Sequence, residues 1–321
     1  MIKLLTALAL TLLASMATAQ ALKPIKIGVA TSGGTTLPAL VISQQRLDEK
    51  HGFKIEWLRL DQAALQKAFA LRQFDISFAE VASDLIRQRA RGDKVQAFHH
   101  GIMANVYILT KKDSPYKTIA DLRGKKVGLY SLTSSSTAAL VKIVRDKYKL
   151  DLRKDFELVV SPPPVLVGLL QRGDVEAMIN VDPIVLRQLE TGQFKQIMDA
   201  DAEWGSIFSG SRLLVTTLAA YEETMQKNPD DIRRLVRMYR EAVDYILKNP
   251  QVYVTTGFIK DSGMKETPEV VKLFEERFSK LYTAKWDHSL INANKAVFDT
   301  AIEMGNLEKV PADWFTFEYS N

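Results

Sequence analysis

The chain has 321 residues, of which 46% are hydrophobic and 25% charged, as is typical of a soluble globular protein of about two domains. It contains no cysteine, which excludes disulfides, thiolate nucleophiles, a lipid-anchored cysteine and cysteine-based metal sites. The net charge of +5 arises from 43 basic and 38 acidic residues that are interspersed, and no basic, aromatic surface of the kind that binds nucleic acid is evident.

The first 19 residues have the pattern of a secretory signal peptide. A positive start at Met1-Ile2-Lys3 precedes an apolar run over residues 4–13 and the small-x-small sequence Ala17-Thr18-Ala19. The apolar run is too short to cross a bilayer, and a buried N-terminal helix is the alternative. We therefore expect export to the periplasm, cleavage after Ala19 and a mature chain that begins at Gln20.

Strands and helices alternate along the first third of the mature chain. Apolar runs predict strands over residues 23–29, 53–60, 74–78, 95–100 and 105–110. Helical spacing of apolar residues predicts helices over residues 38–47, 63–71 and 83–91. This alternation favours a mostly parallel sheet with helices on both faces.

The same pattern then restarts. Further strands are predicted near residues 126–130, over 156–161 and 174–180, over 194–199, and at 212–217 as a return strand. Helices are predicted up to Tyr148, over 165–171, up to Leu189, and over 230–247, 268–278 and 292–304. An aromatic cluster at residues 314–319 ends the chain, and we expect it to pack in the core.

Hydroxyl side chains crowd one strand-to-helix junction. Six of the seven residues from Ser131 to Thr137 carry a hydroxyl, between an apolar strand and a helical pattern. One or two of them suffice to cap the first turn. The others, together with the free N–H groups and the helix dipole, favour an oxyanion, a carboxylate or the polar edge of a heterocycle as a ligand.

Two motifs resemble those of a known family. The sequence TIADLRGKKVGLY at residues 118–130 resembles the family's entry to a second lobe, and LLQRGDVEAMINVDPIV at residues 169–185 resembles its strand and Asp-Pro turn. FDISFAEVA, from Phe74, is similar to its third strand. The chain thus resembles periplasmic solute-binding proteins of ABC importers, in the group for nitrate, sulfonates, taurine and thiamine pyrimidine precursors.

The resemblance implies an α/β fold of the type II periplasmic-binding-protein class. Each of two lobes would hold a mixed, mostly parallel sheet flanked by helices, with the ligand cleft between the lobes. We assign residues 20–110 to lobe 1, 111–212 to lobe 2, and 213–321 to a return strand and C-terminal helices of lobe 1, with crossings near 110–115 and 209–215. The resemblance also implies a small-molecule ligand, an importer permease as partner, a monomer, and no cofactor, metal or nucleic acid.

Ligand-binding residues are expected at the carboxyl ends of strands, where open α/β sheets bind small molecules. In lobe 1 we expect them to be Ser32, Gly33, Gly34, Thr35, Glu80, Val81, Gly101 and Asn105. In lobe 2 we expect Leu132, Thr133, Ser134, Ser135, Asn180 and Asp182.

Structural roles remain open for several of these residues. The turn that begins at Ser32 is also compatible with a plain glycine turn that binds nothing. Glu80 is compatible with a helix cap, and Asp182 with an N-cap before Pro183. His99 and His100 are neighbours on a predicted strand and should face opposite sides, so we expect one buried and one exposed ring and no shared metal.

Enzymatic and regulatory functions fit the sequence less well. A serine hydrolase would need a nucleophile elbow and a positioned histidine, but G-x-S-x-G is absent and the chain has four histidines. A zinc hydrolase would need H-E-x-x-H, which is also absent. A pyrimidine-synthesising enzyme of the same fold would be intracellular and use His and Cys, and a ligand-sensing regulator would need a DNA-binding module before Lys23. We therefore expect a binding protein.

Overall fold

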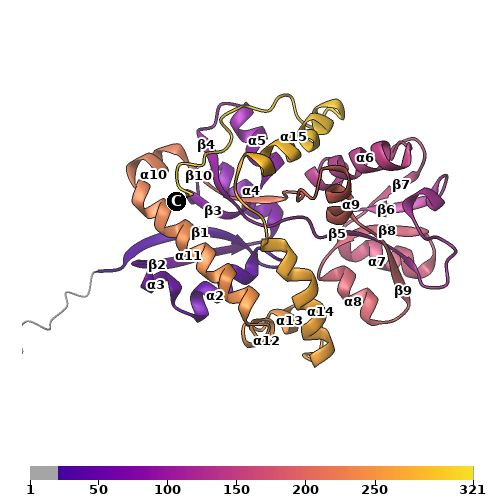
Figure 1. Cartoon of the computed structure of the whole chain (residues 1–321), viewed down its shortest axis with the longest axis horizontal. Coiled ribbons are helices and arrows are strands. Elements are labelled where there is room, and N and C mark those ends of the chain that lie inside the picture. Colours follow the sequence, from indigo (N-terminus) through magenta and orange to yellow (C-terminus); the bar gives the residue numbers. More distant parts are fainter. Residues whose placement is uncertain (1–20, 321) are drawn as a thin grey trace, which may run out of the picture.

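The computed structural model describes residues 21–320, which form two α/β lobes (Figure 1). The predicted signal peptide lies outside these residues. The sheet of lobe 1 has the order β2 (Phe53–Leu60), β1 (Lys23–Ala30), β3 (Ile76–Val81), β10 (Thr216–Tyr221) and β4 (Val95–His100). The sheet of lobe 2 has the order β7 (Glu157–Val160), β6 (Lys126–Leu129), β8 (Ala177–Val181), β5 (Val106–Lys111) and β9 (Phe194–Asp199).

Both sheets share one topology. The first three strands of each order are parallel, and the fourth, β10 or β5, is antiparallel to both of its neighbours. In each lobe that antiparallel strand has just arrived from the other lobe. The expected fold class, two lobes each with a mixed sheet, is confirmed.

The predicted position of the first crossing is wrong. From the resemblance we placed residues 105–110 in lobe 1 and the first crossing near 110–115. In the structure Val106–Thr110 pairs with β8 in lobe 2, so the chain crosses at residues 101–105. The predicted return strand is also displaced: β10 begins at Thr216, and residues 208–215 form the second crossing.

The two crossing segments pair with each other. The Gly101 N–H donates to the Thr216 carbonyl at 2.8 Å, and the Ala104 N–H donates to the Leu213 carbonyl at 2.7 Å. A Cβ atom at Gly101 would lie 2.4 Å from the Thr216 hydroxyl and 3.1 Å from the Thr216 backbone. Glycine is therefore required at this position by the close approach of the second segment.

Helices cover both faces of each sheet. In lobe 1, α4 (Gln62–Ala70) and α5 (Ala82–Ala90) pack on one face, and α2 (Thr36–Gln44) and α11 (Pro229–Lys248) on the other. In lobe 2, α6 (Ser135–Tyr148) and α9 (Ala200–Ile207) lie on one face, and α7 (Pro163–Arg172) and α8 (Ile184–Glu190) on the other. Shorter helices are α3 (Leu47–Lys50), α10 (Glu222–Lys227), α12 (Val252–Thr255) and α13 (Phe258–Asp261).

The last two helices join the lobes. The helix α14 (Pro268–Phe278) packs with the core of lobe 1, as expected, and ends in a 3₁₀ turn, Ser279–Tyr282. The expectation that all C-terminal helices return to lobe 1 is wrong for α15 (His288–Glu303), which packs against α6 of lobe 2. An ion pair of 2.6 Å between Arg145 and Glu303 reinforces this contact.

The aromatic tail then returns to lobe 1. Ala97 of β4 donates its N–H to the carbonyl of Trp314 at 2.9 Å, and the Trp314 ring is buried against Phe298 of α15. The cluster therefore serves packing, as predicted. None of the helices described is both long and apolar enough to cross a membrane.

Candidate functional site

The polar ends of the two sheets face each other across the crossings. β4 ends at His100 and β5 begins at Val106, so five residues, which span at most about 18 Å, separate the two sheet edges. The carboxyl ends of β1, β3 and β4 share the edge in lobe 1. Because β5 is antiparallel to β8, its start lies at the carboxyl ends of β8 and β6. The predicted site residues of both lobes therefore border one interlobe region.

The turn after β1 is held from the C-terminal part of lobe 1. Ser32 is exposed, Gly33 has a left-handed φ of 84°, and Gly34 and Thr35 are buried. The Tyr282 hydroxyl donates to the Gly34 carbonyl at 2.7 Å, and a Cβ atom at Gly34 would lie 2.5 Å from the Leu281 side chain. The turn is therefore fixed in place, with Ser32 free to meet a ligand.

Glu80 is a fully buried carboxyl at the end of β3. One oxygen accepts from the Gln88 amide at 3.1 Å, whereas the other has no hydrogen-bond partner. Burial raises the pKa of Glu80 well above 4.5, the nearby Asp84 carboxylate raises it further, and hydrogen bonds from Gln88 and Ser77 oppose the shift. The adjacent Val81 is half-buried. Glu80 can thus serve as a neutral donor or, if ionised, as the partner of a cation.

Replacing Glu80 by Gln is expected to stabilise the ligand-free protein at pH 7 by about 1 kcal/mol, because the neutral amide avoids the cost of keeping a carboxyl protonated or charged in a buried site. The folded-state pKa is raised, so wild-type stability is fully present below pH 4.5 and declines as the pH rises towards the folded-state value. The variant should lose that decline in urea unfolding measured from pH 4 to 8. An equally steep decline in both proteins would contradict the assignment.

Gly101 and Asn105 bound the first crossing. The Gly101 carbonyl accepts from the Tyr239 hydroxyl at 2.8 Å, so this residue belongs to the joint between the lobes. The Asn105 amide donates to the backbone carbonyl of Asp182 at 3.3 Å, so it directly contacts one of the residues predicted for lobe 2.

Only some of the hydroxyl groups in residues 131–137 accept backbone N–H groups at the start of α6. Ser134 is the N-cap of α6 and accepts from the Thr137 N–H at 3.2 Å, while Ser131 accepts from the Thr133 N–H at the same distance. The Leu132 carbonyl accepts from the Asn306 amide at 3.1 Å, and the Leu132 side chain is exposed. The exposed Thr133 hydroxyl lies 3.5 Å from that of Ser131, and the Ser135 hydroxyl is buried without a partner.

Changing Thr133, Ser134 and Ser135 together to Ala is expected to weaken solute binding about fivefold or more, since each lost hydrogen bond contributes about 1 kcal/mol. Loss of the Ser134 cap should also lower the free energy of unfolding by about 1 kcal/mol. The single variant Ser134→Ala is the control, because it removes the cap and leaves the unused hydroxyls. Equal affinities of the triple variant and the wild type would assign the whole run to capping.

Asn180 and Asp182 are buried, rather than exposed at the surface of a cleft. The Asn180 amide donates to the Pro163 carbonyl at 2.9 Å, and its oxygen accepts from the Val181 N–H at 2.9 Å. Asp182 accepts from the Leu186 N–H at 3.2 Å, a contact with the first turn of α8. Its principal partner is Arg277 of α14, whose Nε lies 2.7 Å from the Asp182 carboxylate.

Arg277 is a functional candidate that the sequence did not reveal. It reaches from lobe 1 to lobe 2, where its guanidinium lies 3.8 Å above the Tyr107 ring and donates to Gln196 at 2.8 Å. Desolvation alone would lower the pKa of Arg277, but the facing Asp182 carboxylate raises it above its usual value. Burial raises the pKa of Asp182, and Arg277 opposes that shift. Nothing in a helical pattern shows which arginine spans two lobes.

The expectation for the two histidines is wrong. Both rings are buried and lie 4.3 Å apart, tilted by 35°, rather than on opposite sides of the strand. The register of β4 against β10 shifts between Leu218 and Ala219, beside these residues. This irregularity breaks the strict alternation on which the expectation rested.

A comparison with protein families identifies the chain. Residues 49–252 match the model of a family described as NMT1/THI5 like. The chain belongs to this family. The match covers both motifs on which the resemblance in the sequence rested, and it confirms that resemblance.

One curated relative and two solved structures illustrate what the chain is similar to. A relative from Brucella abortus (strain 2308), named "Putative binding protein", is 24% identical over 81% of this chain and 79% of its own. The periplasmic aliphatic sulphonate-binding protein of Escherichia coli is 19% identical with a TM-score of 0.74, over 90% of this chain and 89% of its own. The desulfurization enzyme DszB also matches, with 15% identity and a TM-score of 0.66, over 92% of this chain and 97% of its own.

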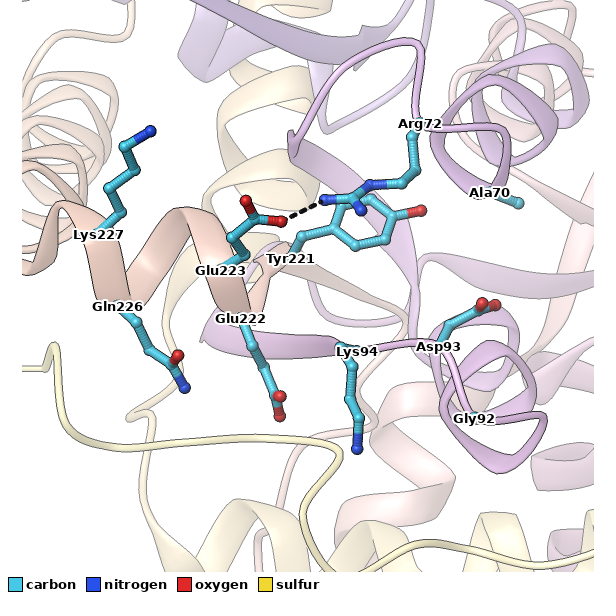
Figure 2. Close-up of a pocket in the computed structure, with 10 residues that line it drawn as sticks. All are labelled: Ala70, Arg72, Gly92, Asp93, Lys94, Tyr221, Glu222, Glu223, Gln226 and Lys227. Atoms are coloured by element: carbon cyan, nitrogen blue, oxygen red, sulfur yellow. Dashed lines mark hydrogen bonds and ion pairs between the residues drawn. The ribbon is translucent and has the colours of Figure 1, made fainter.

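One large pocket of this NMT1/THI5-like chain lies away from the interlobe region. A hollow of about 710 Å³ lies beside Tyr221, at the end of β10 that is distant from the crossings (Figure 2). The Arg72 guanidinium stacks 4.2 Å above the Tyr221 ring and pairs with Glu223 at 3.4 Å (Figure 2). Glu222 pairs with Arg89 at 2.6 Å. Because this hollow is distant from the crossings and both of its glutamates are already paired, we do not assign the solute to it.

Proposed function

We propose that this chain is the extracytoplasmic solute-binding component of an ABC importer. It would capture a small polar or anionic organic molecule, such as a sulfonate or a pyrimidine precursor, between its lobes and deliver it to a permease. One observation carries the proposal: two sheets present polar strand ends to each other across a paired two-segment joint. Relatives whose names describe binding proteins support it.

The proposed ligand contacts come from both sides of the interlobe region. Ser32 and Glu80 would contribute from lobe 1, and Thr133 and Ser135 from lobe 2, because these residues hold exposed or unpartnered polar groups. We further propose cleavage after Ala19, a periplasmic location and a monomer in solution.

Binding rather than catalysis is part of the proposal. A hydrolytic serine needs a histidine within hydrogen-bond reach. Within residues 21–320 no histidine is bonded to a serine: His51 pairs with Glu241 at 2.9 Å, and the His288 ring packs on Phe317. His99 donates from Nδ1 to its neighbour's carbonyl and accepts at Nε2 from Arg240, and His100 donates from Nδ1 to the Gly101 carbonyl.

Native mass spectrometry of the protein purified from its host tests the proposal by detecting a co-purified solute. Small-angle scattering with that solute should then show a smaller radius of gyration, because binding favours the closed arrangement of lobes. The exported protein should have the intact mass of a chain that begins at Gln20. Turnover of the solute during incubation would refute a pure binding role.

A further inference from the structure

A second hollow lies on lobe 1, between the end of β4, helix α11 and residues 282–287. It has a volume of about 560 Å³ and a floor of buried rings, those of His99, His100, Tyr239, Tyr282 and Trp286. The His99 ring lies 5.8 Å from that of Tyr239 and is stacked with Trp286 at 6.4 Å and 27°. Such a floor offers a flat ligand both stacking faces and edges.

The rim of this hollow carries charges of both signs. Arg240, Asp244 and Lys285 are exposed on it, and Asp287 is half-buried. Within residues 21–320 no ion pair involves Arg240, Lys285 or Asp244, and the Arg240 Nε donates to the His99 ring at 3.3 Å. Asp287 is occupied in part, because it accepts from the Leu290 N–H at 3.1 Å as the N-cap of α15.

A further polar group lies in the wall. The Ser320 hydroxyl lines the hollow, is inaccessible to solvent and has no hydrogen-bond partner. Buried hydroxyls in proteins are nearly always hydrogen-bonded, so an unpartnered one beside a cavity favours a ligand that supplies the missing partner.

We propose that this hollow is a second binding site, for a small aromatic zwitterion of the aromatic amino-acid class. The ring lies on the floor formed by the histidines, Tyr239 and Trp286. The carboxylate binds Arg240 and Lys285, and the ammonium group binds Asp244. A net charge of zero among the two cations and two carboxylates of the rim favours a ligand that carries both charges over one that carries a single charge.

This hollow adjoins the joint between the lobes, because Tyr239 and Tyr282 in its floor donate to the Gly101 and Gly34 carbonyls, but the ligand proposed for it does not depend on the proposed function. α11 packs on lobe 1, and no residue of lobe 2 lines the hollow. Failure of the solute-binding proposal therefore leaves this one intact, and the reverse also holds.

Isothermal titration of the mature chain with L-tryptophan, indole-3-acetate and tryptamine tests the ligand class. We expect L-tryptophan to bind about fivefold or more tightly than either singly charged analogue. Arg240→Gln and Lys285→Gln should each weaken it about tenfold, and Asp244→Asn about threefold, since charge-assisted hydrogen bonds are about twice as strong as neutral ones but are weakened by solvent at an exposed rim. Arg237→Gln, exposed on the same helix outside the hollow, should stay within twofold of wild type.

Three outcomes would overturn the proposal. The first is no binding of L-tryptophan at millimolar concentration, and the second is equal binding of the three compounds. The third is loss of L-tryptophan binding in the Thr133, Ser134 and Ser135 triple variant, which would move the compound to the interlobe region. Circular dichroism of each variant checks that the fold persists, as expected for exposed rim residues.

Discussion

Replacing Arg277 by Met is expected to lower the free energy of unfolding at pH 7 by about 3 kcal/mol. The Asp182 side chain is 1% exposed and that of Arg277 15%, so the substitution leaves a carboxylate inside the protein without its cation. Breaking a buried pair from one side typically costs about 3–5 kcal/mol. We expect the lower end of that range, because burial already raises the pKa of Asp182 and the carboxyl can take up a proton instead.

A double variant separates the charge from the packing. Asp182→Asn combined with Arg277→Met leaves no buried charge, and it should recover most of the stability lost in Arg277→Met alone. Arg233→Met is the matched control, since Arg233 pairs at 2.8 Å with Asp230, whose side chain is 89% exposed. Its loss should stay below about 1 kcal/mol. Urea unfolding of the four proteins gives the comparison, and equal losses for Arg277→Met and Arg233→Met would contradict it.

The same pair should bias the lobes towards each other. Arg277 belongs to lobe 1 and Asp182 to lobe 2, so their contact exists only when the lobes are close. Ligand-free Arg277→Met should therefore show a larger radius of gyration in small-angle scattering than wild type. Solute affinity should fall as well, because a smaller fraction of molecules holds the binding-competent arrangement.

The fold could be predicted from the sequence because its signals are local. Apolar runs between turn residues located most strands to within a few residues, and hydroxyls marked the start of α6. The partner of a strand is not a local property. Val106–Thr110 reads as an ordinary buried strand, and only its pairing with β8 shows that the chain has already crossed to lobe 2.

The candidate site was predicted less completely, because the contacts of its residues are also not local in the sequence. Strand ends located Glu80 and the hydroxyl run, but they did not show which hydroxyls are hydrogen-bonded: Ser131 and Ser134 accept backbone N–H groups, whereas Ser135 has no partner. Arg277 lies 95 residues from Asp182 along the chain, and its role depends on how α14 packs. Such contacts arise from tertiary structure alone.

Acid should destabilise the protein through its buried histidines. Burial lowers the pKa of His100 from 6.5 to about 4, hydrogen bonds to the Gly101 and Ala284 carbonyls oppose this shift, and Arg240 and Arg212 add to it. Burial and the neighbouring His100 also lower the pKa of His99. Both rings are thus neutral in the folded protein at pH values where they would be charged in the unfolded chain.

The protein loses stability in acid because its unfolded chain binds more protons than the folded protein. Between about pH 6.5 and 4 the unfolded chain binds more protons than the folded protein, so the stability due to His100 is fully present above pH 6.5 and is lost as the pH falls. The difference between these two pKa values corresponds to about 3 kcal/mol of stability. Glu80 acts in the opposite direction above pH 4.5 and offsets part of the loss.

His100→Gln isolates this contribution. Its free energy of unfolding should be lower than that of wild type at pH 7, since Gln fills the site imperfectly, but it should fall by about 3 kcal/mol less between pH 7 and 4. Urea unfolding at half-unit intervals of pH measures both curves. His288→Gln, at an exposed position, should run parallel to wild type throughout. A His100→Gln curve parallel to wild type would show that this imidazole does not control acid stability, and the decline would then have to come from His99 or from carboxylates.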